Sequence, residues 1–256
     1  MKVDIFTKGK DRLRNEDCYG YDKEVFIVAD GATDKSGKLY DRRTGGEILS
    51  RLIVATCLET GLTGEKLVKK LTEICAAFYK QNNTMALANG FYRFAASFVC
   101  AKIIKNKLVV TQVGDTAFRI NRTKTYLNPW LVGELVSELR ARYIQTTGDI
   151  KRSRQFILPL LKEQYTFCND AKSPAGWGVI NGIPVPKKFI KIYHFPLNSI
   201  NSLEIFSDGY YDMPKGIKIK DWEDMYRNIQ KQDPYKYKRY KATKAKDDRT
   251  VMVVQF

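Results

Sequence analysis

Two apolar runs in this sequence end in the same way. The run from Val25 reads VFIVADGATD and the run from Leu203 reads LEIFSDGYYD, so each ends in Asp-Gly with a second aspartate four residues after the first. Short apolar runs bounded by turn residues are typical of buried strands. An Asp-Gly pair after a strand either makes a tight turn or delivers a carboxylate to a shared site. The rest of the sequence is needed to choose between a turn and a shared site.

Strand-like and helix-like segments alternate along the chain. TGGE, from Thr44 to Glu47, is a capping box that predicts a helix start, and Asp221 is predicted to cap the last helix. His194, the single histidine, is predicted to pack within a strand. The Gly/Pro-rich segment 172–188 is predicted to be a loop that turns near the functional site. Strands are predicted at 2–6, 18–22, 24–30, 94–104, 107–113, 117–121, 189–195, 202–208 and 250–256. No repeat or linker divides the chain, so we expect residues 1–256 to form one α+β domain.

Charge and cysteine content limit the classes of function. With 44 Lys and Arg against 28 Asp and Glu, the net charge of +16 favours anionic partners. The five cysteines include no Cys-x-x-Cys pair, which is typical of reduced thiols. No segment has the pattern of a signal peptide or a membrane span, so we expect a cytoplasmic protein that does not enter a membrane. A single histidine excludes zinc sites with several histidines, so an enzyme of this sequence must use carboxylates.

The segment 215–246 is strongly basic. It carries 11 Lys and Arg against 4 Asp and Glu, a net charge of +7, and includes YKYKRYK from Tyr235 to Lys241. Two interpretations stay open: a solvated loop after the last helix, or a docking surface for an acidic or multiply phosphorylated partner. Nucleic acid, which interleaved aromatic and basic residues can bind, is a less favoured partner.

Carboxylates gather at the predicted strand ends of this otherwise basic chain. They are Glu16, Asp17, Asp30, Asp115, Asp208, Asp212, Asp247 and Asp248. Each Asp-Gly pair alone is more often a turn than a ligand. Converging carboxylates, however, cannot all stay ionised without cations, and Mg²⁺ and Mn²⁺ prefer oxygen ligands. The whole set therefore predicts a site for divalent metal ions.

Five ordered motifs resemble the metal-dependent serine/threonine protein phosphatases of the type 2C, or PPM, family. They are RLRNED from Arg12, then VADG, GDT, SDGYYD and DDRT. No single motif is specific to the family, but the occurrence of all five in this order over almost the whole chain is specific to it. The resemblance implies a four-layer α+β sandwich, in which two stacked antiparallel β-sheets are flanked by helices on both outer faces.

The resemblance also implies roles for the carboxylates. By analogy with the family, Asp30 bridges two ions of Mn²⁺ or Mg²⁺, and the carbonyl group of Gly31 binds one of them. Asp208 and Asp247 hold the other ion. Glu16 and Asp17 complete the shell, directly or through water.

Further positions match the family, and two depart from it. Asp115 and Asp212 match a weaker third metal site, and Arg12 matches the arginine that grips the substrate phosphate. After Asp-Gly the family often has a glycine-rich stretch ending in a histidine that is proposed to protonate the leaving group. This chain has ATDKSGK instead, so Asp34 or a metal-bound water is the candidate acid. Asp248 stands where the family commonly has Asn.

The implied function is hydrolysis of phosphoserine and phosphothreonine in phosphorylated proteins. The implied mechanism is attack by water at a two-metal centre, without a covalent phosphoenzyme. The alternative is a catalytically weak relative that binds acidic, phosphorylated or nucleic-acid partners through its basic face. Retention of Asp30, Asp208 and Asp247 favours the enzyme, because a degenerate relative is expected to lose such residues.

Overall fold

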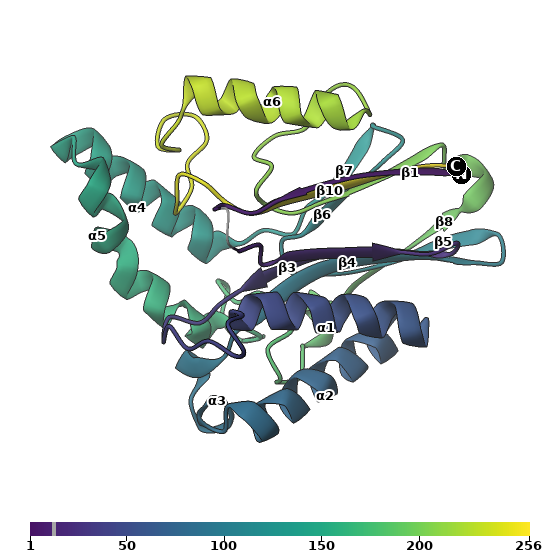
Figure 1. Ribbon diagram of the computed structural model, residues 1–256, viewed down its shortest axis with the longest axis horizontal. Helices are drawn as coiled ribbons and strands as arrows, with labels where there is room; N and C mark the ends of the chain where they lie inside the picture. The colour runs from purple at the N-terminus through teal and green to yellow at the C-terminus, as the bar shows by residue number, and fades with distance from the viewer. Residues whose placement is uncertain (12–13) are drawn as a thin grey trace.

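The computed structural model describes residues 1–11 and 14–256, and it contains two stacked antiparallel sheets (Figure 1). The first sheet has the order β1-β10-β9-β6-β7, with bounds Lys2–Lys8, Arg249–Gln255, Ser202–Phe206, Ala117–Ile120 and Lys124–Tyr126. The second has the order β2-β3-β4-β5-β8, with bounds Asp17–Tyr21, Val25–Ala32, Ala95–Ile104, Lys107–Val113 and Lys191–Pro196. Arg12 lies outside the described residues.

Strand β3 shows why its sequence is apolar without interruption. Ile27 and Ala29 pack into the core between the second sheet and its helices. Phe26 and Val28 point to the other side, into the core between the two sheets. Both faces of the strand are thus buried, and a strand buried on both faces has no polar side to alternate with.

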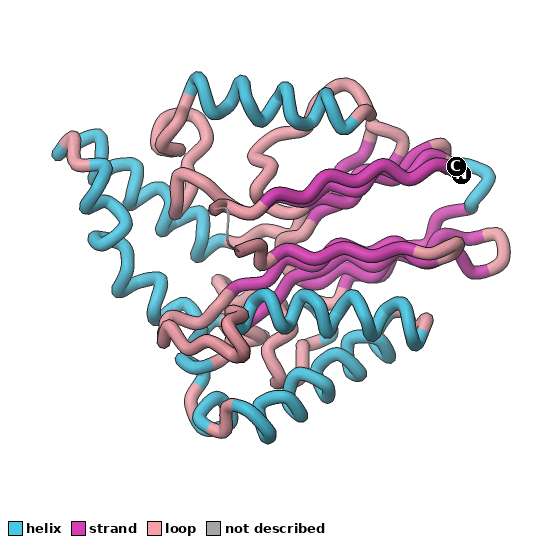
Figure 2. The backbone as a smooth tube through the Cα atoms, viewed as in Figure 1, coloured by secondary structure: helices cyan, strands magenta, loops and turns pink. Residues whose placement is uncertain are grey.

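Helices cover both outer faces of the sheet pair (Figure 2). α1 (Gly45–Thr60) and α2 (Gly64–Asn82) pack on the second sheet, and α6 (Ile219–Gln232) packs on the first. α4 (Leu131–Thr147) and α5 (Ile150–Glu163) form a hairpin at one end of the sheets (Figure 1). The short α3 (Met85–Ala88) and the 3₁₀ turns Gly90–Tyr92, Gln164–Phe167, Lys187–Phe189 and Leu197–Ser199 complete the elements. The predicted four-layer α+β sandwich is confirmed.

The local predictions have mixed outcomes. The capping box at Thr44 and Glu47 is confirmed at the start of α1. Asp221 is not the cap residue of α6, contrary to the prediction; the cap residue is Lys218. Asp221 lies in the first turn of the helix, and its carboxylate accepts a hydrogen bond from the Lys218 amide over 2.9 Å. His194 lies in β8 as predicted, but it is exposed because β8 is an edge strand whose Tyr193 and Phe195 face the core. In the described residues, no helix combines the length and apolar character that crossing a membrane requires.

Candidate active site

The strand ends that carry the predicted carboxylates lie together, at the end of the sheets opposite the chain termini (Figure 1). In the second sheet, Asp17 at the start of β2 is paired in register with Asp30 near the end of β3. In the first sheet, Asp208 follows the end of β9 and Asp247 precedes the start of β10. Since β9 and β10 are antiparallel neighbours, these two aspartates share one end as well.

Asp115 joins this group because of a chain crossing. It lies in the turn between β5 in the second sheet and β6 in the first. The side chain of Asn128 donates a hydrogen bond to the carbonyl group of Gly114 over 2.8 Å, which ties the segment before α4 to this turn. Gly114 has a φ of 79°, a conformation that glycine adopts without strain.

The electrostatics of the group show that the carboxylates converge. Burial, and after it the charges of Asp17, Asp208 and Asp115, raise the pKa of Asp30 well above its usual range. The crowded protein surroundings, and after them the charges of Asp247 and Asp115, raise the pKa of Asp208 in the same way, although the residue is exposed at its surface. Carboxylates from both sheets therefore act on the same small volume, where they cannot all be ionised without compensating cations.

Asp17 is buried, and its contacts reach from the second sheet to the first. The Ser207 hydroxyl donates to Oδ2 of Asp17 over 2.7 Å and itself accepts a hydrogen bond from the Thr250 amide over 2.9 Å. Oδ1 of Asp17 is buried and has no partner in the described part of the chain. Burial raises the pKa of Asp17 to about 7, although the hydrogen bonds from Ser207 and Thr250 oppose that rise.

Glu16 is held by cationic and hydroxyl donors. Lys10 Nζ lies 2.5 Å from its Oε2 and 3.1 Å from Oδ2 of Asp248. Thr44, the cap residue of α1, donates to Oε1 over 2.8 Å, and Thr33 donates to the same atom. Burial alone would raise the pKa of Glu16, but Lys10 and the two hydroxyl groups outweigh it and the pKa is lowered.

A second lysine is inserted among the aspartates. Lys244 Nζ lies 2.5 Å from Oδ1 of Asp247. Burial would lower the pKa of Lys244, but the charges of Asp247, Asp208 and Asp30 together raise it. The ammonium group thus faces both walls of the acidic group and partly neutralises it.

A cavity of about 790 Å³ opens onto these residues. Its walls combine the acidic residues with basic and aromatic side chains, among them Trp130 just before α4, Arg154 on α5, Trp177 in the loop after α5, and Lys241 and Lys244 in the loop after α6. The loop around Trp177 lines it, as the sequence predicted for GWGVING. The predicted site residues on its walls are Glu16, Asp30, Gly31, Asp34, Asp115, Asp208 and Asp247.

Three carboxylates of the predicted group, Asp17, Asp212 and Asp248, are not among the residues that line the cavity. The Asp212 carboxylate accepts hydrogen bonds from the Met213 amide over 2.8 Å and from the Tyr240 hydroxyl over 3.4 Å. Asp248 pairs with Lys10, which lines the cavity, but only its neighbour Asp247 is itself a lining residue. Asp34 lies on the wall, with Oδ2 buried and without a partner in the described part.

The basic segment is folded rather than free. The Asp233 carboxylate accepts hydrogen bonds from the amides of Tyr237, Lys238 and Tyr240 over 2.9–3.1 Å. Lys236 is fully buried, and its ammonium group donates to the Asp233 carbonyl over 2.6 Å. Residues 241–244, at the end of this segment, line the same cavity as the carboxylates. This part of the segment is a loop after α6, as one of the two interpretations has it, but Lys236 and Thr243 within it are buried, and its position beside the cavity was not apparent from the sequence.

The predicted ligands all offer oxygen atoms, which suit a hard divalent cation. In residues 1–11 and 14–256, no group of three or more carboxylate, histidine or cysteine side chains is arranged to hold a metal ion. Lys10 and Lys244 instead pair with Glu16 and Asp247. The oxygen-only chemistry and the unpartnered Oδ1 of Asp17 nevertheless fit Mg²⁺ or Mn²⁺.

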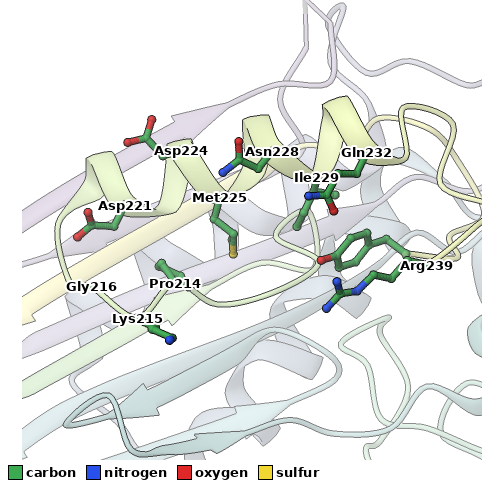
Figure 3. A pocket seen from close by; sticks show the side chains of 11 residues that line it. Pro214, Lys215, Gly216, Asp221, Asp224, Met225, Asn228, Ile229, Gln232 and Arg239 are labelled. Carbon is green, nitrogen blue, oxygen red and sulfur yellow. The ribbon is translucent and has the colours of Figure 1, made fainter.

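A smaller hollow of about 390 Å³ lies beneath α6 (Figure 3). Met225 points from the helix into the space above Pro214, and Arg239 closes the opposite end. None of the predicted site residues lines it. The acidic group and the larger cavity therefore form the candidate active site.

Comparison with known proteins identifies the fold. No protein-family model and no curated protein sequence matches the chain. Among solved structures, the serine/threonine phosphatase Stp1 from Staphylococcus aureus aligns with a TM-score of 0.51 at 17% identity, covering 100% of this chain and 94% of Stp1. The Mycobacterium tuberculosis serine/threonine phosphatase PstP/Ppp aligns with a TM-score of 0.57 at 12% identity, covering 100% and 98%.

A third structure is the catalytic domain of PstP in complex with two manganese ions. It has a TM-score of 0.54 at 12% identity and covers 98% of this chain and 96% of that one. Similarity at such low identity shows a shared fold. The chain therefore has the fold of bacterial serine/threonine phosphatases, and the resemblance found in the sequence is confirmed at that level.

Proposed function

Because the chain has this fold, we propose that it is a metal-dependent phosphatase that hydrolyses phosphoserine and phosphothreonine in proteins. One observation carries the proposal. Carboxylates from both sheets, among them Asp30, Asp208 and Asp247, converge on one cavity at the end of the sandwich. Carboxylates that converge in this way stay ionised together only when cations compensate their charge.

The carboxylates provide the proposed metal ligands. Asp30 and the Gly31 carbonyl group would hold one ion, and Asp30, Asp208 and Asp247 would hold the other, with Glu16 and Asp17 completing the shell. A pair of Mn²⁺ or Mg²⁺ ions would supply Lewis-acid charge that polarises the phosphoryl group and lowers the pKa of the attacking water. The two manganese ions of the PstP catalytic domain support this choice of cofactor. Asp115 and Asp212 remain candidates for a weaker third site.

The remaining residues position these groups. Ser207 holds Asp17 in one orientation through its 2.7 Å hydrogen bond, so the unpartnered Oδ1 is left for a cation. Thr44 at the capped start of α1 orients Glu16. Asp34 lies on the cavity wall and is the candidate proton donor to the leaving group. Arg12 is the proposed phosphate-gripping arginine.

Hydrolysis assays test the proposal. We expect turnover of p-nitrophenyl phosphate and of a phosphothreonine peptide with Mn²⁺, loss of turnover in EDTA, and weaker restoration by Ca²⁺. Asp208→Asn should abolish turnover while the protein stays folded, because a ligand is lost and repulsion among carboxylates is relieved. The surface variant Asp4→Asn, whose carboxylate pairs with Lys2 in β1, is the matched control. Undiminished turnover in EDTA, or in Asp208→Asn, would contradict the proposal.

A further inference from the structure

Two cations on the cavity wall have no acidic partner. Lys35 follows the Asp-Gly end of β3, and its ammonium group donates to the Thr33 carbonyl over 3.0 Å. Arg154, on α5, donates through Nη1 to the Thr243 carbonyl over 2.7 Å. Both line the cavity and are half-buried. Among the described residues, no carboxylate lies within ion-pair distance of either side chain, in contrast to Lys10 and Lys244.

These two cations are also close enough to repel each other. Burial, and after it the charges of Arg154 and Lys244, lower the pKa of Lys35, while Glu16 and Asp34 oppose this only in part. Like charges placed together and partly removed from water are unfavourable unless an anion joins them. Burial, and after it the charge of Arg140, lower the pKa of Arg154, which Asp247 opposes only in part, so a bound anion would offset the repulsion along the wall from Lys35 to Arg154.

Neighbouring residues show that this arrangement is not general to the local sequence. Lys38, three residues after Lys35, is exposed and donates to the Asn82 carbonyl over 2.8 Å. Arg152, two residues before Arg154 on α5, is exposed and pairs with Asp149. A solvated basic surface explains Lys38 and Arg152, but it does not explain two unpaired cations turned into a cavity.

We propose that Lys35 and Arg154 bind the phosphoryl oxygens of the substrate. This inference rests on the proposed function, since it concerns the phosphate monoester that would be hydrolysed. Lys244 links the two halves of the cavity: its charge acts on Lys35 on one side and on Asp208 and Asp30 on the other. An anion between Lys35 and Arg154 therefore lies beside the carboxylates. A guanidinium group can contact two phosphate oxygens at once and an ammonium group a third.

The test measures the binding of inorganic phosphate by isothermal titration in the presence of Mg²⁺. We expect Lys35→Ala and Arg154→Ala each to weaken binding about tenfold or more, the scale of losing a charge-assisted hydrogen bond. The matched controls Lys38→Ala and Arg152→Ala should stay within about twofold of the wild type, because exposed charges are screened. Mg²⁺ affinity should be unchanged in all four variants.

Arg154 also donates a hydrogen bond to the Thr243 carbonyl group, so its loss could weaken the fold. A second variant separates the effect on binding from the effect on folding. Arg154→Lys keeps a cation and should recover part of the phosphate affinity, and thermal unfolding shows whether either variant is destabilised. In steady-state assays on a phosphothreonine peptide, loss of Lys35 should raise KM more than it lowers kcat.

The outcomes also separate this inference from the proposed function. Phosphate binding that depends on Lys35 and Arg154, in a protein that hydrolyses no phosphoester, would support the anion site and refute the phosphatase. Wild-type protein that fails to bind millimolar phosphate would overturn the anion site. So would equal losses in the Lys38 and Arg152 controls, or unchanged binding in the Lys35 and Arg154 variants.

Discussion

Replacing Asp17 by Asn should stabilise the metal-free protein, and more so as the pH rises. Asp17 is buried with 6% of its surface exposed, and its pKa is raised from 3.8 to about 7, first by burial and then by Asp248 and Asp247 against the hydrogen bonds of Ser207 and Thr250. A raised carboxyl pKa means that the folded state binds the proton more tightly than the unfolded state. The folded state is then most stable below pH 3.8 and loses stability up to about pH 7.

The size of the effect follows from the shift. Between 3.8 and about 7 the shift is about three pKa units, which corresponds to about 4 kcal/mol at pH 8. At pH 5.5 only about half of this, roughly 2 kcal/mol, has been lost. Asn keeps the shape and can still accept from Ser207, but it carries no charge. The free energy of unfolding of Asp17→Asn should therefore exceed that of the wild type by at most these amounts, since neighbouring carboxylates that stay protonated reduce the repulsion.

The assay is urea unfolding in EDTA at pH 5.5 and pH 8.0. We expect the advantage of Asp17→Asn to grow by about 2 kcal/mol between the two pH values, whereas Asp4→Asn should show no such growth. Added Mn²⁺ should reverse the order, because a bound cation stabilises the wild type and the variant lacks a ligand. A variant that is destabilised at both pH values, or whose advantage does not change with pH, would refute the reasoning.

Two further predictions concern the cations. Lys244→Met should tighten Mn²⁺ binding about tenfold in titration calorimetry, because the ammonium group lies 2.5 Å from Asp247 and competes with the ion for this carboxylate. The control Lys246→Met, at an exposed residue, should leave Mn²⁺ binding unchanged. Weaker Mn²⁺ binding in Lys244→Met would show that the lysine supports the site instead. Arg12→Ala should lower kcat/KM by a factor that corresponds to about 2 to 3 kcal/mol of lost transition-state stabilisation, with metal affinity near normal. Arg12→Lys should recover only part of the loss, since an ammonium group lacks the planar fork of donors. A loss of metal affinity in Arg12→Ala would show that Arg12 does not act by binding phosphate.

Much of the acidic half of the site could be predicted from the sequence, because each carboxylate carries a local signal. Asp30 and Asp208 each stand at the end of an apolar run of sequence, and both belong to Asp-Gly pairs. The placement of Asp212 could not be predicted in the same way. Its spacing after Asp208 matches the motif, but its carboxylate is turned toward Tyr240 by a loop from a distant part of the chain.

The sequence by itself determined the strands, the capped start of α1 and the carboxylates at the strand ends, because these depend on neighbours within a few residues. Only the tertiary structure decided which charges meet. Lys10, Lys35, Arg154 and Lys244 come from four separate segments, and a lysine in a loop has the same local pattern whether it faces water or a cavity. Their positions depend on long-range contacts, such as the hydrogen bond from Arg154 to the Thr243 carbonyl group and those from Arg140 to the carbonyl groups of Lys236 and Ala242. Local sequence does not encode the electrostatic balance of a cavity, since that balance is a sum over all the charges that the fold brings together.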